Sequence, residues 1–380
     1  MYPALAVVEQ LKVESDKVEG FKPAADQVST INSQPSTFNL QPSNLELLWV
    51  GSEGGMEAEL VERAGIPYKA IPAAGLHGVG LKRVPGNLQT LARGVMASQK
   101  ILSEFKPDVL FFTGGYVAVP MALAGRKIPS LLYVPDVEPG LALKTLARFA
   151  SCITLTTEDS RQFFSPKAKT VVTGYPIRSE LALWTKAAGR DTFGIKSDLP
   201  VLLVFGGSKG ARSINLALFE HLDHLLEQME VIHISGELDW EMVLAARTRL
   251  PQHLSKRYHA YSYLHSEMGA ALAAADLSVS RSGASVLGEF PFFGLPALLV
   301  PYPYAWRYQK VNAESLANHG AALIIEDAKL KSGLYLTVEK ILDAPEKLQT
   351  MSQAMHALST PNAAAQIAAQ LVELAGAKHD

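Results

Sequence analysis

Residues 201–205 read Val-Leu-Leu-Val-Phe, and residues 206–212 continue Gly-Gly-Ser-Lys-Gly-Ala-Arg. A short, continuous apolar run is typical of a strand that is buried on both faces of a parallel sheet. The glycines predict a tight turn, and a helical pattern over residues 213–229 follows that turn. Strand, glycine-rich turn and helix together form the repeating unit of a doubly wound α/β domain.

Such units recur along the chain in two series, with helical patterns such as 56–64 and 88–105 between the apolar runs. The runs predicted as strands are 47–50, 109–113, 130–134, 153–156 and 170–173, and then 201–205, 231–235, 277–280, 297–300 and 322–325. Two series predict two doubly wound, Rossmann-like domains. We place them at residues 1–177 and 200–380, joined by a polar linker over residues 178–199.

The first domain has an unusual beginning. Residues 14–45 are polar and rich in Ser, Asn, Gln and Pro, a composition that predicts a flexible surface insertion. The chain opens directly in a helix, for which Pro3 suits the first turn, whereas a doubly wound domain ordinarily starts with a strand and a glycine loop. We therefore expect the natural protein to be longer at its N-terminus by such a strand and loop.

Composition excludes several classes of protein. The chain has 380 residues and a formal net charge of −2, which argues against a general nucleic-acid binder. Cys152 is the only cysteine, so an internal disulfide and a cysteine metal cluster are both excluded, and no metal site is expected. No run of about 18 apolar residues occurs, so any membrane contact is predicted to be peripheral.

Two loops of the second domain are candidates for binding a nucleotide. The loop 206–212 combines glycines with a helix start, an arrangement that binds anions through backbone N–H groups. A plain strand–helix turn fits the same residues, and a nicotinamide cofactor with Glu237 on its ribose is a further alternative. The second loop begins at Arg281, and Glu289 follows in the next helix. A carboxylate there can accept hydrogen bonds from both hydroxyls of a ribose, or be a solvated surface group.

Polar residues also follow predicted strands of both domains at the end where parallel sheets bind ligands. Gln309 and Asn312 come after the run 297–300. In the first domain Gly114-Gly115-Tyr116 follows the run 109–113, and Asp136 follows the run 130–134. Each of them is also explained as an ordinary turn or a solvated loop residue.

Taken together, these stretches resemble the MurG family, the N-acetylglucosaminyltransferases of peptidoglycan synthesis. The end of the family's N-terminal glycine motif is similar to Tyr2-Pro3-Ala4-Leu5-Ala6, and its second glycine motif is similar to Gly114-Gly115-Tyr116. Its Gly-Asn-Pro-Val-Arg resembles Gly174-Tyr175-Pro176-Ile177-Arg178. Its donor-site pattern resembles Gly207-Ser208-Lys209-Gly210-Ala211-Arg212, Arg281-Ser282-Gly283-Ala284 with Glu289, and Gln309 with Asn312.

The resemblance implies a GT-B fold, two Rossmann-like domains facing a cleft, that transfers N-acetylglucosamine with inversion from UDP-N-acetylglucosamine to lipid I, without a cofactor. The last helix is expected to pack back on the first domain. Acceptor contacts are expected at Tyr2, Gly114, Gly115 and Tyr116. The implied donor-binding residues are Arg178, Gly207, Ser208, Lys209, Gly210, Arg281, Ser282, Gly283, Ala284, Glu289, Gln309 and Asn312. The expected location is the cytoplasmic face of the bacterial plasma membrane.

The chain departs from the family's pattern in three places. The family's His-Glu-Gln-Asn is replaced by residues 133–136, which leaves Asp136 as the acid–base candidate there. Tyr308 replaces the first of a pair of glutamines, and the Gly-Gly-Thr-Gly-Gly-His loop is missing, its His falling before Met1. Two alternatives therefore stay open: another UDP-sugar enzyme of the same fold, such as a glycolipid synthase or epimerase, or a nucleotide-sugar binder with impaired catalysis.

A membrane-facing patch is predicted in the first domain. Apolar residues lie beside basic ones over residues 76–83, and two further basic residues follow in the next helix, a combination that suits an anionic lipid surface. A surface loop and a solvated helix face explain the pattern equally well. The residues are Leu76, Val79, Leu81, Lys82, Arg83, Arg93 and Lys100.

Overall fold

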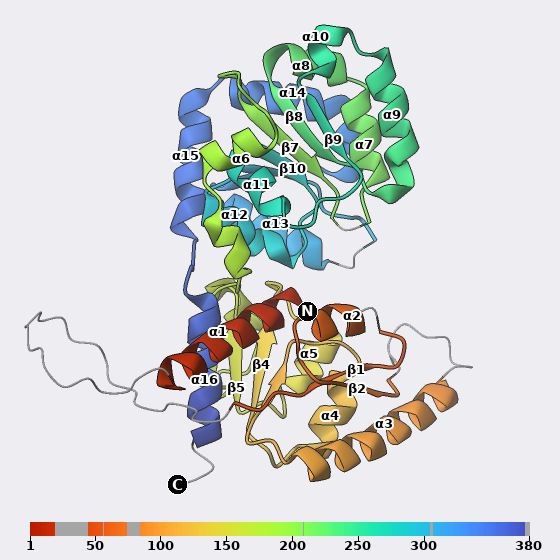
Figure 1. Cartoon of the computed structure of the whole chain (residues 1–380), viewed down its shortest axis with the longest axis vertical. Coiled ribbons are helices and arrows are strands. Elements are labelled where there is room, and N and C mark those ends of the chain that lie inside the picture. The colour runs from red at the N-terminus through yellow and green to blue at the C-terminus, as the bar shows by residue number, and fades with distance from the viewer. Residues whose placement is uncertain (20–44, 56, 74–83, 208, 305–306, 377–380) are drawn as a thin grey trace, which may run out of the picture.

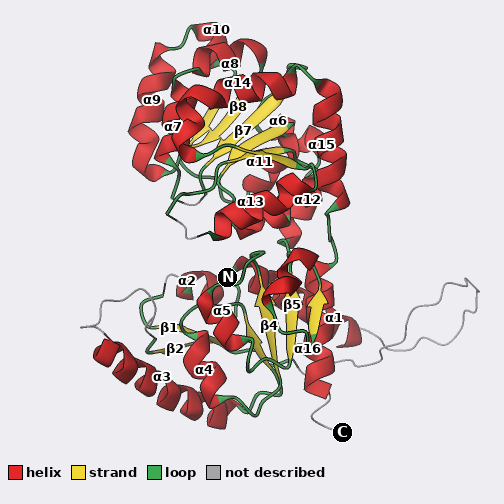
Figure 2. Cartoon of the chain, turned by 180° about the vertical axis from the view of Figure 1, so that it is seen from behind, coloured by secondary structure: helices red, strands yellow, loops and turns green. Residues whose placement is uncertain are grey.

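The computed structural model folds into two lobes, one above the other in Figure 1. It describes residues 1–19, 45–55, 57–73, 84–207, 209–304 and 307–376. The chain passes from the lower lobe to the upper one and returns at its end, because helix α16 (Ala363–Gly376) lies in the lower lobe. Both lobes are built from parallel strands with helices on their faces, so the predicted fold class is confirmed (Figure 2).

The upper lobe contains a six-stranded parallel sheet in the order β12-β11-β10-β7-β8-β9. Its strands are β7 (Val201–Phe205), β8 (Glu230–Ile234), β9 (Tyr258–Tyr261), β10 (Leu277–Ser280), β11 (Ala297–Leu299) and β12 (Ala322–Ile324). Its helices are α6 (Lys186–Thr192), α7 (Arg212–Phe219), α8 (Leu222–Gln228), α9 (Trp240–Arg249), α10 (Gln252–Ser255), α11 (Met268–Ala274), α12 (Glu289–Phe293), α13 (Tyr308–Asn318), α14 (Leu330–Leu342) and α15 (Pro345–Ala357).

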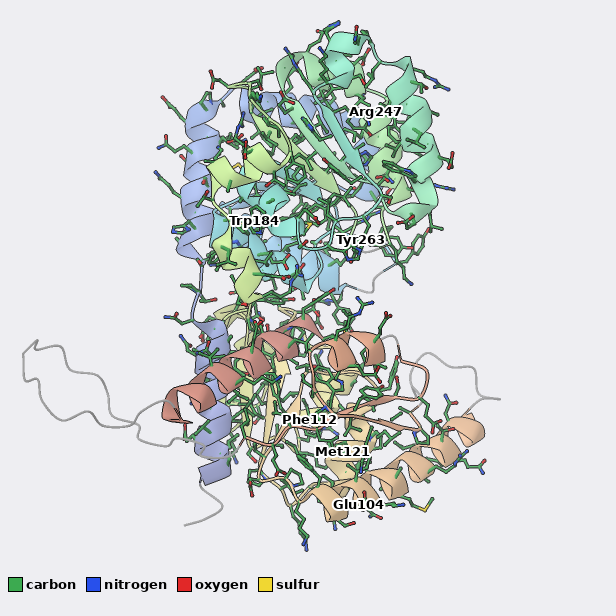
Figure 3. The ribbon with its side chains drawn as sticks, viewed as in Figure 1. Glu104, Phe112, Met121, Trp184, Arg247 and Tyr263 are labelled. Carbon is green, nitrogen blue, oxygen red and sulfur yellow. The ribbon has the colours of Figure 1, made fainter. Side chains whose placement is uncertain are left out.

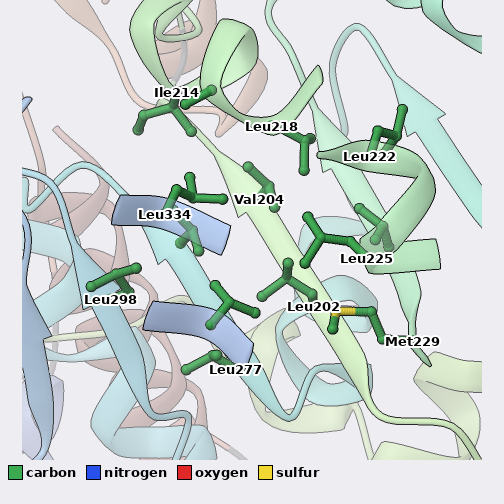
Figure 4. Packing of buried hydrophobic residues seen from close by; sticks show 14 of the residues in the cluster. Leu202, Val204, Ile214, Leu218, Leu222, Leu225, Met229, Leu277, Leu298 and Leu334 are labelled. Carbon is green, nitrogen blue, oxygen red and sulfur yellow. The ribbon is translucent and has the colours of Figure 1, made fainter. Parts of the chain in front are cut away.

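The core of the upper lobe forms because β7 is apolar on both faces. On one face Leu202 and Val204 pack with Leu218, Leu225 and other side chains from the covering helices (Figure 4). The single helix predicted over residues 213–229 is in fact two, because the backbone leaves helical geometry at His221, with φ of −132°. The break allows both α7 and α8 to turn their leucines onto the same core.

The lower lobe has two separate parallel sheets among the described residues, β1-β2 and β3-β4-β5-β6. The strands are β1 (Trp49–Ser52), β2 (Tyr68–Ile71), β3 (Leu110–Phe112), β4 (Ser130–Val134), β5 (Cys152–Leu155) and β6 (Thr170–Val172). The helices are α1 (Tyr2–Glu19), α2 (Ala58–Arg63), α3 (Val84–Phe105), α4 (Ala118–Ala124), α5 (Leu141–Leu146) and α16. Figure 3 places Phe112 and Met121 inside this lobe and Glu104 on its outer helix α3.

A largely apolar cavity of about 560 Å³ lies at the division between the two lower sheets. Val50 of β1, Leu110 of β3 and Leu11 of α1 are among the residues that line it. In the upper sheet the corresponding central place is held by β7, between β8 and β10. Helices α1 and α16 pack on β4 beside this cavity, where Val7, Tyr133 and Ile367 share one buried cluster.

The predicted domain limits stay a prediction, although the structure describes the segments that they concern. Helix α1 continues to Glu19, into the stretch predicted as an insertion, and residues 20–44 lie outside the described part. The predicted linker 178–199 contains a 3-10 turn, η3 (Ser179–Leu183), and helix α6. Helix α6 packs so closely on α11 that an added Cβ at Gly189 would collide with the Ala270 carbonyl.

Candidate functional site

The candidate site lies where the two lobes meet. Strands β7 and β10 of the upper sheet and β3 and β4 of the lower one run parallel within their sheets, and the loops after them carry the predicted residues. Ligands bind to open parallel sheets outside the carboxyl ends of the strands. The loops after β4 and β10 are joined through Asn312, so the carboxyl ends of the two sheets face each other.

The loop after β7 has the backbone geometry that an anion site needs. Gly207 and Gly210 have φ of +88° and +75°, which residues with side chains rarely adopt. A Cβ at Gly210 would also collide with the carbonyl oxygen of Ser235. The loop ends at α7, and the first N–H groups of a helix have no partner within it, so they can bind an anion. Lys209 is exposed, and Ser208 lies outside the described residues.

Arg281 was predicted to bind the donor, and in the structure its guanidinium joins the end of β11, the first turn of α7 and the 3-10 turn after β12. It donates to the Val300 carbonyl at 3.2 Å and to Ser213 Oγ at 2.8 Å, and it pairs with Asp327. Its side chain is only 10% exposed and stacks over the Tyr302 ring, 5.2 Å from the centroid. These contacts indicate that Arg281 shapes the site by fixing its loops.

Glu289 and Arg178 lie close enough for the charge of Arg178 to act on the Glu289 carboxyl. Burial raises the pKa of the Glu289 carboxyl to about 7, while the charge of Arg178 and a hydrogen bond from Ser285 act in the opposite direction. Arg178 donates to Glu180 at 2.6 Å and lies over the Tyr2 ring, 4.8 Å from its centroid. The Nε of Arg178 is buried and has no hydrogen-bond partner among the described residues.

Asn312 lies at the contact between the lobes, and its side chain is completely buried. Its Oδ1 accepts from the Val137 N–H at 3.0 Å, and its Nδ2 donates to Asp136 at 2.8 Å and to the Ser282 carbonyl at 3.1 Å. Burial raises the pKa of Asp136, and the hydrogen bond from Asn312 lowers it. The structure therefore brings the predicted Asp136 and Asn312 together as bonded partners.

The remaining predicted donor residues line the same loops. Ser282 is fully buried and donates its hydroxyl to the Gln309 carbonyl at 2.7 Å. Gln309 also accepts at Oε1 from the Tyr302 N–H at 2.9 Å, which holds the loop after β11. Gly283 precedes a 3-10 turn (Ala284–Leu287), and Ala284 packs against the buried cluster under α1. Glu289 begins α12 directly after this turn.

The predicted acceptor residues lie in the lower lobe. Gly114 and Gly115 follow β3 with φ of +105° and +84°, and Tyr116 beside them is 54% exposed. Tyr2 begins α1 and reaches Arg178. The roles of these residues stay predictions.

The predicted membrane patch can be described only in part. Leu76, Val79, Leu81, Lys82 and Arg83 lie outside the described residues. On α3, Leu88 and Met96 are exposed apolar residues, and Arg93 and Lys100 are exposed as well. No helix among the described residues is long and apolar enough to span a membrane.

Comparison with known families gives the class of the protein. The N-terminal domain of glycosyltransferase family 28 matches residues 37–155, and the C-terminal domain of the same family matches residues 201–370. The two lobes and their cleft are thus those of a two-domain glycosyltransferase, as predicted.

Individual relatives give the family. A protein from Roseiflexus sp. (strain RS-1) is 40% identical over 97% of this chain and 91% of its own, and one from Desulforamulus reducens is 36% identical over 86% and 89%. Both are named UDP-N-acetylglucosamine–N-acetylmuramyl-(pentapeptide) pyrophosphoryl-undecaprenol N-acetylglucosamine transferase. This chain belongs to that family, the MurG family, and the predicted resemblance is confirmed.

Solved structures agree on the fold. MurG from Acinetobacter baumannii superposes with a TM-score of 0.72 at 24% identity, covering 98% of this chain and 95% of its own. A UDP-GlcNAc 2-epimerase from Neisseria meningitidis superposes with a TM-score of 0.63 at 14% identity, covering 98% of each chain. Fold alone therefore does not separate transferases from epimerases.

Two structural residues of the site were missed by the sequence analysis. Asp327 holds Arg281, and its position just after β12 could have indicated it. Glu138 pairs with Arg307 across the lobes at 2.7 Å, which no local pattern predicts.

Proposed function

We propose that this chain transfers N-acetylglucosamine from UDP-N-acetylglucosamine to the muramyl sugar of lipid I, an undecaprenyl-diphosphate-linked acceptor. The observation that carries the proposal is the 40% identity, over 97% of the chain, to a relative named for this reaction. The geometry of the cleft supports it, because two loops suited to a nucleotide diphosphate and its ribose lie on one lobe and the predicted acceptor residues lie on the other.

In this proposal the upper lobe holds the donor. The N–H groups of the loop Gly207–Gly210 and of the start of α7 bind the diphosphate, whose negative charge the helix end favours. Glu289 accepts hydrogen bonds from the ribose, and the positive charge of Arg178 acts on this carboxylate. Gln309 contacts the sugar, from the helix whose first turn holds the loop after β11.

The reaction is a single displacement with inversion. The acceptor hydroxyl oxygen forms a bond to the anomeric carbon while the bond from that carbon to the diphosphate oxygen breaks, and the electron pair leaves with UDP. The diphosphate gains charge as it departs, and preorganised N–H groups of the glycine loop stabilise that charge. The hydroxyl proton passes to a base.

The lower lobe receives the lipid-linked acceptor. Tyr2 and the loop Gly114–Tyr116 are proposed as its contacts, because the tyrosine side chains are exposed and Tyr2 lies over Arg178. The exposed face of α3 is proposed to lie on the anionic cytoplasmic surface of the membrane, where exposed apolar and basic residues alternate. That peripheral contact would present the diphosphate-linked sugar to the cleft.

A direct test combines the full chain, UDP-N-acetylglucosamine and a short-chain lipid I analogue. We expect disaccharide product and UDP in equal amounts, with no product from UDP-glucose at the same concentration. Formation of an epimerised UDP-sugar without acceptor would instead identify an epimerase. UDP binding by calorimetry without any turnover would identify a nucleotide-sugar binder, and either result would refute the transferase proposal.

A further inference from the structure

Three consecutive residues of the lower lobe enter the upper lobe after β4. Asp136 bonds to Asn312, Glu138 pairs with Arg307, and Val137 between them is 1% exposed. Val137 belongs to the buried apolar cluster of the upper lobe, together with Leu299 and Ala313. The segment 136–138 is therefore an inserted contact, held by apolar packing as well as by polar bonds.

Asn312 is the point where this segment meets the loop after β10 that contains Ser282, here called the donor loop. Its amide oxygen faces an N–H of Val137, and its amide nitrogen faces a carbonyl of Ser282. Since the Val137 N–H can only donate and the Ser282 carbonyl can only accept, the amide has a single orientation in which both bonds form. One buried side chain thus holds the lower lobe's loop after β4 and the upper lobe's loop after β10 at a fixed separation.

The donor loop is tied to the same helix by a second bond. Ser282 Oγ donates to the carbonyl of Gln309, one turn before Asn312 on α13. Movement of the segment 136–138 is therefore transmitted through α13 to Ser282 and to Gln309, the proposed contact of the donor sugar. Asp159 also reaches α13, through Ser315 at 2.7 Å, but that bond lies beyond the turn that touches the donor loop.

We propose that Asn312 and Asp136 are a positioning pair that sets the acceptor-side loop against the donor loop, and that Asp136 acts as the partner of Asn312 and not as the base. Its Oδ1 is occupied by the Asn312 amide, and this bond needs only an acceptor oxygen at position 136. An asparagine there can supply the same oxygen, whereas a base needs the carboxylate.

The test compares Asp136→Ala with Asp136→Asn in the full chain. For the alanine variant we expect kcat to fall about tenfold, the order of one lost positioning hydrogen bond, with KM for UDP-N-acetylglucosamine unchanged within about twofold. For the asparagine variant we expect kcat and the pH profile of the parent. An asparagine variant as inactive as the alanine variant would overturn the proposal and return Asp136 to the role of base.

Asn312→Asp provides the converse perturbation. It places a second carboxylate against Asp136 and against the Ser282 carbonyl, so we expect a loss at least as large as that of Asp136→Ala. Adding Asp136→Asn to this variant restores a donor opposite the new acceptor and should recover part of the activity. Asp159→Ala is the matched control, because it removes one bond between the lobes without touching the donor loop. Equal losses for Asp159→Ala and Asp136→Ala would contradict the specific role of the pair.

The kinetic readout rests on the proposed function. A second readout, the distance between the lobes, is independent of that function. Lys127 and Lys256 are exposed on the lower and upper lobes, and the one native cysteine, Cys152, is buried. Fluorescent dyes on Lys127→Cys and Lys256→Cys therefore report the separation of the lobes by energy transfer. We expect a larger or broader separation in Asp136→Ala and in Asn312→Asp, and the parental value in Asp136→Asn. Unchanged transfer in all three would overturn the proposal, even if the parent chain proved inactive as a transferase.

Discussion

Replacing Glu289 by glutamine should change the pH dependence of stability. Burial raises the pKa of this carboxyl from its ordinary 4.5 to about 7. The folded state therefore binds a proton that the unfolded state has already released, and the free energy of unfolding falls as pH rises through this window. The difference of about two and a half pH units corresponds to at most about 3 kcal/mol. Partial solvation of the cleft reduces this to about 1 to 3 kcal/mol.

Urea unfolding of the parent and of Glu289→Gln, at about pH 5 and about pH 9, measures this effect. The free energy of unfolding of the variant minus that of the parent should be larger at the higher pH than at the lower pH, by about 1 to 3 kcal/mol. Glu180→Gln is the control, since it removes an exposed carboxylate bonded to the same Arg178. The affinity for UDP, measured against pH, is a second readout. The protonation of UDP itself is the same with both proteins, so a difference between their affinity profiles near pH 7 reports Glu289. Stability and affinity profiles that run parallel in parent and variant would refute the reasoning.

Other perturbations follow from the loops and from α3. Gly210→Ala should abolish measurable UDP binding by calorimetry while Gly320→Ala, also at positive φ but in open space, leaves it unchanged; equal effects would move the diphosphate elsewhere. Arg281→Lys should destabilise the fold by about 1 to 3 kcal/mol in urea, because lysine cannot reproduce three directed bonds. Arg93→Glu with Lys100→Glu should reduce co-sedimentation with anionic vesicles several-fold, and undiminished binding would exclude this face of α3.

Three buried strands could be predicted from sequence to the residue, whereas the predictions for the equally buried β5 and β8 were shifted by one residue. β4, β7 and β10 have the bounds that were predicted, and a turn follows each of them directly; β10 is fully buried although two of its four residues are serines. β2 and β9 were missed, since polar and small residues interrupt them, as in the Tyr-Lys-Ala-Ile of β2, where Lys69 and Ala70 are exposed. Strands at the ends of a sheet are covered on fewer sides, so their composition carries a weaker signal.

The loops of the candidate site were predictable, but their internal bonds were not. Glycine-rich turns after strands identify themselves by composition, and thus Gly207, Gly210 and Gly114 were found without coordinates. The contact between Asn312 and Asp136 joins residues 176 positions apart in different lobes. Nothing in either local sequence specifies that pairing, because it depends on how two complete sheets pack.

The return of α16 to the lower lobe has a consequence for synthesis on the ribosome. Ile367 and Leu371 share a buried cluster with Val7 and Tyr133, so residues from both ends of the chain complete one core. The lower lobe, although translated first, cannot close that core until α16 has been synthesised. The whole sheet of the upper lobe and α14 are synthesised before α16, so the upper lobe can fold first. Nascent lower lobe would meanwhile expose apolar surface, a task for chaperones.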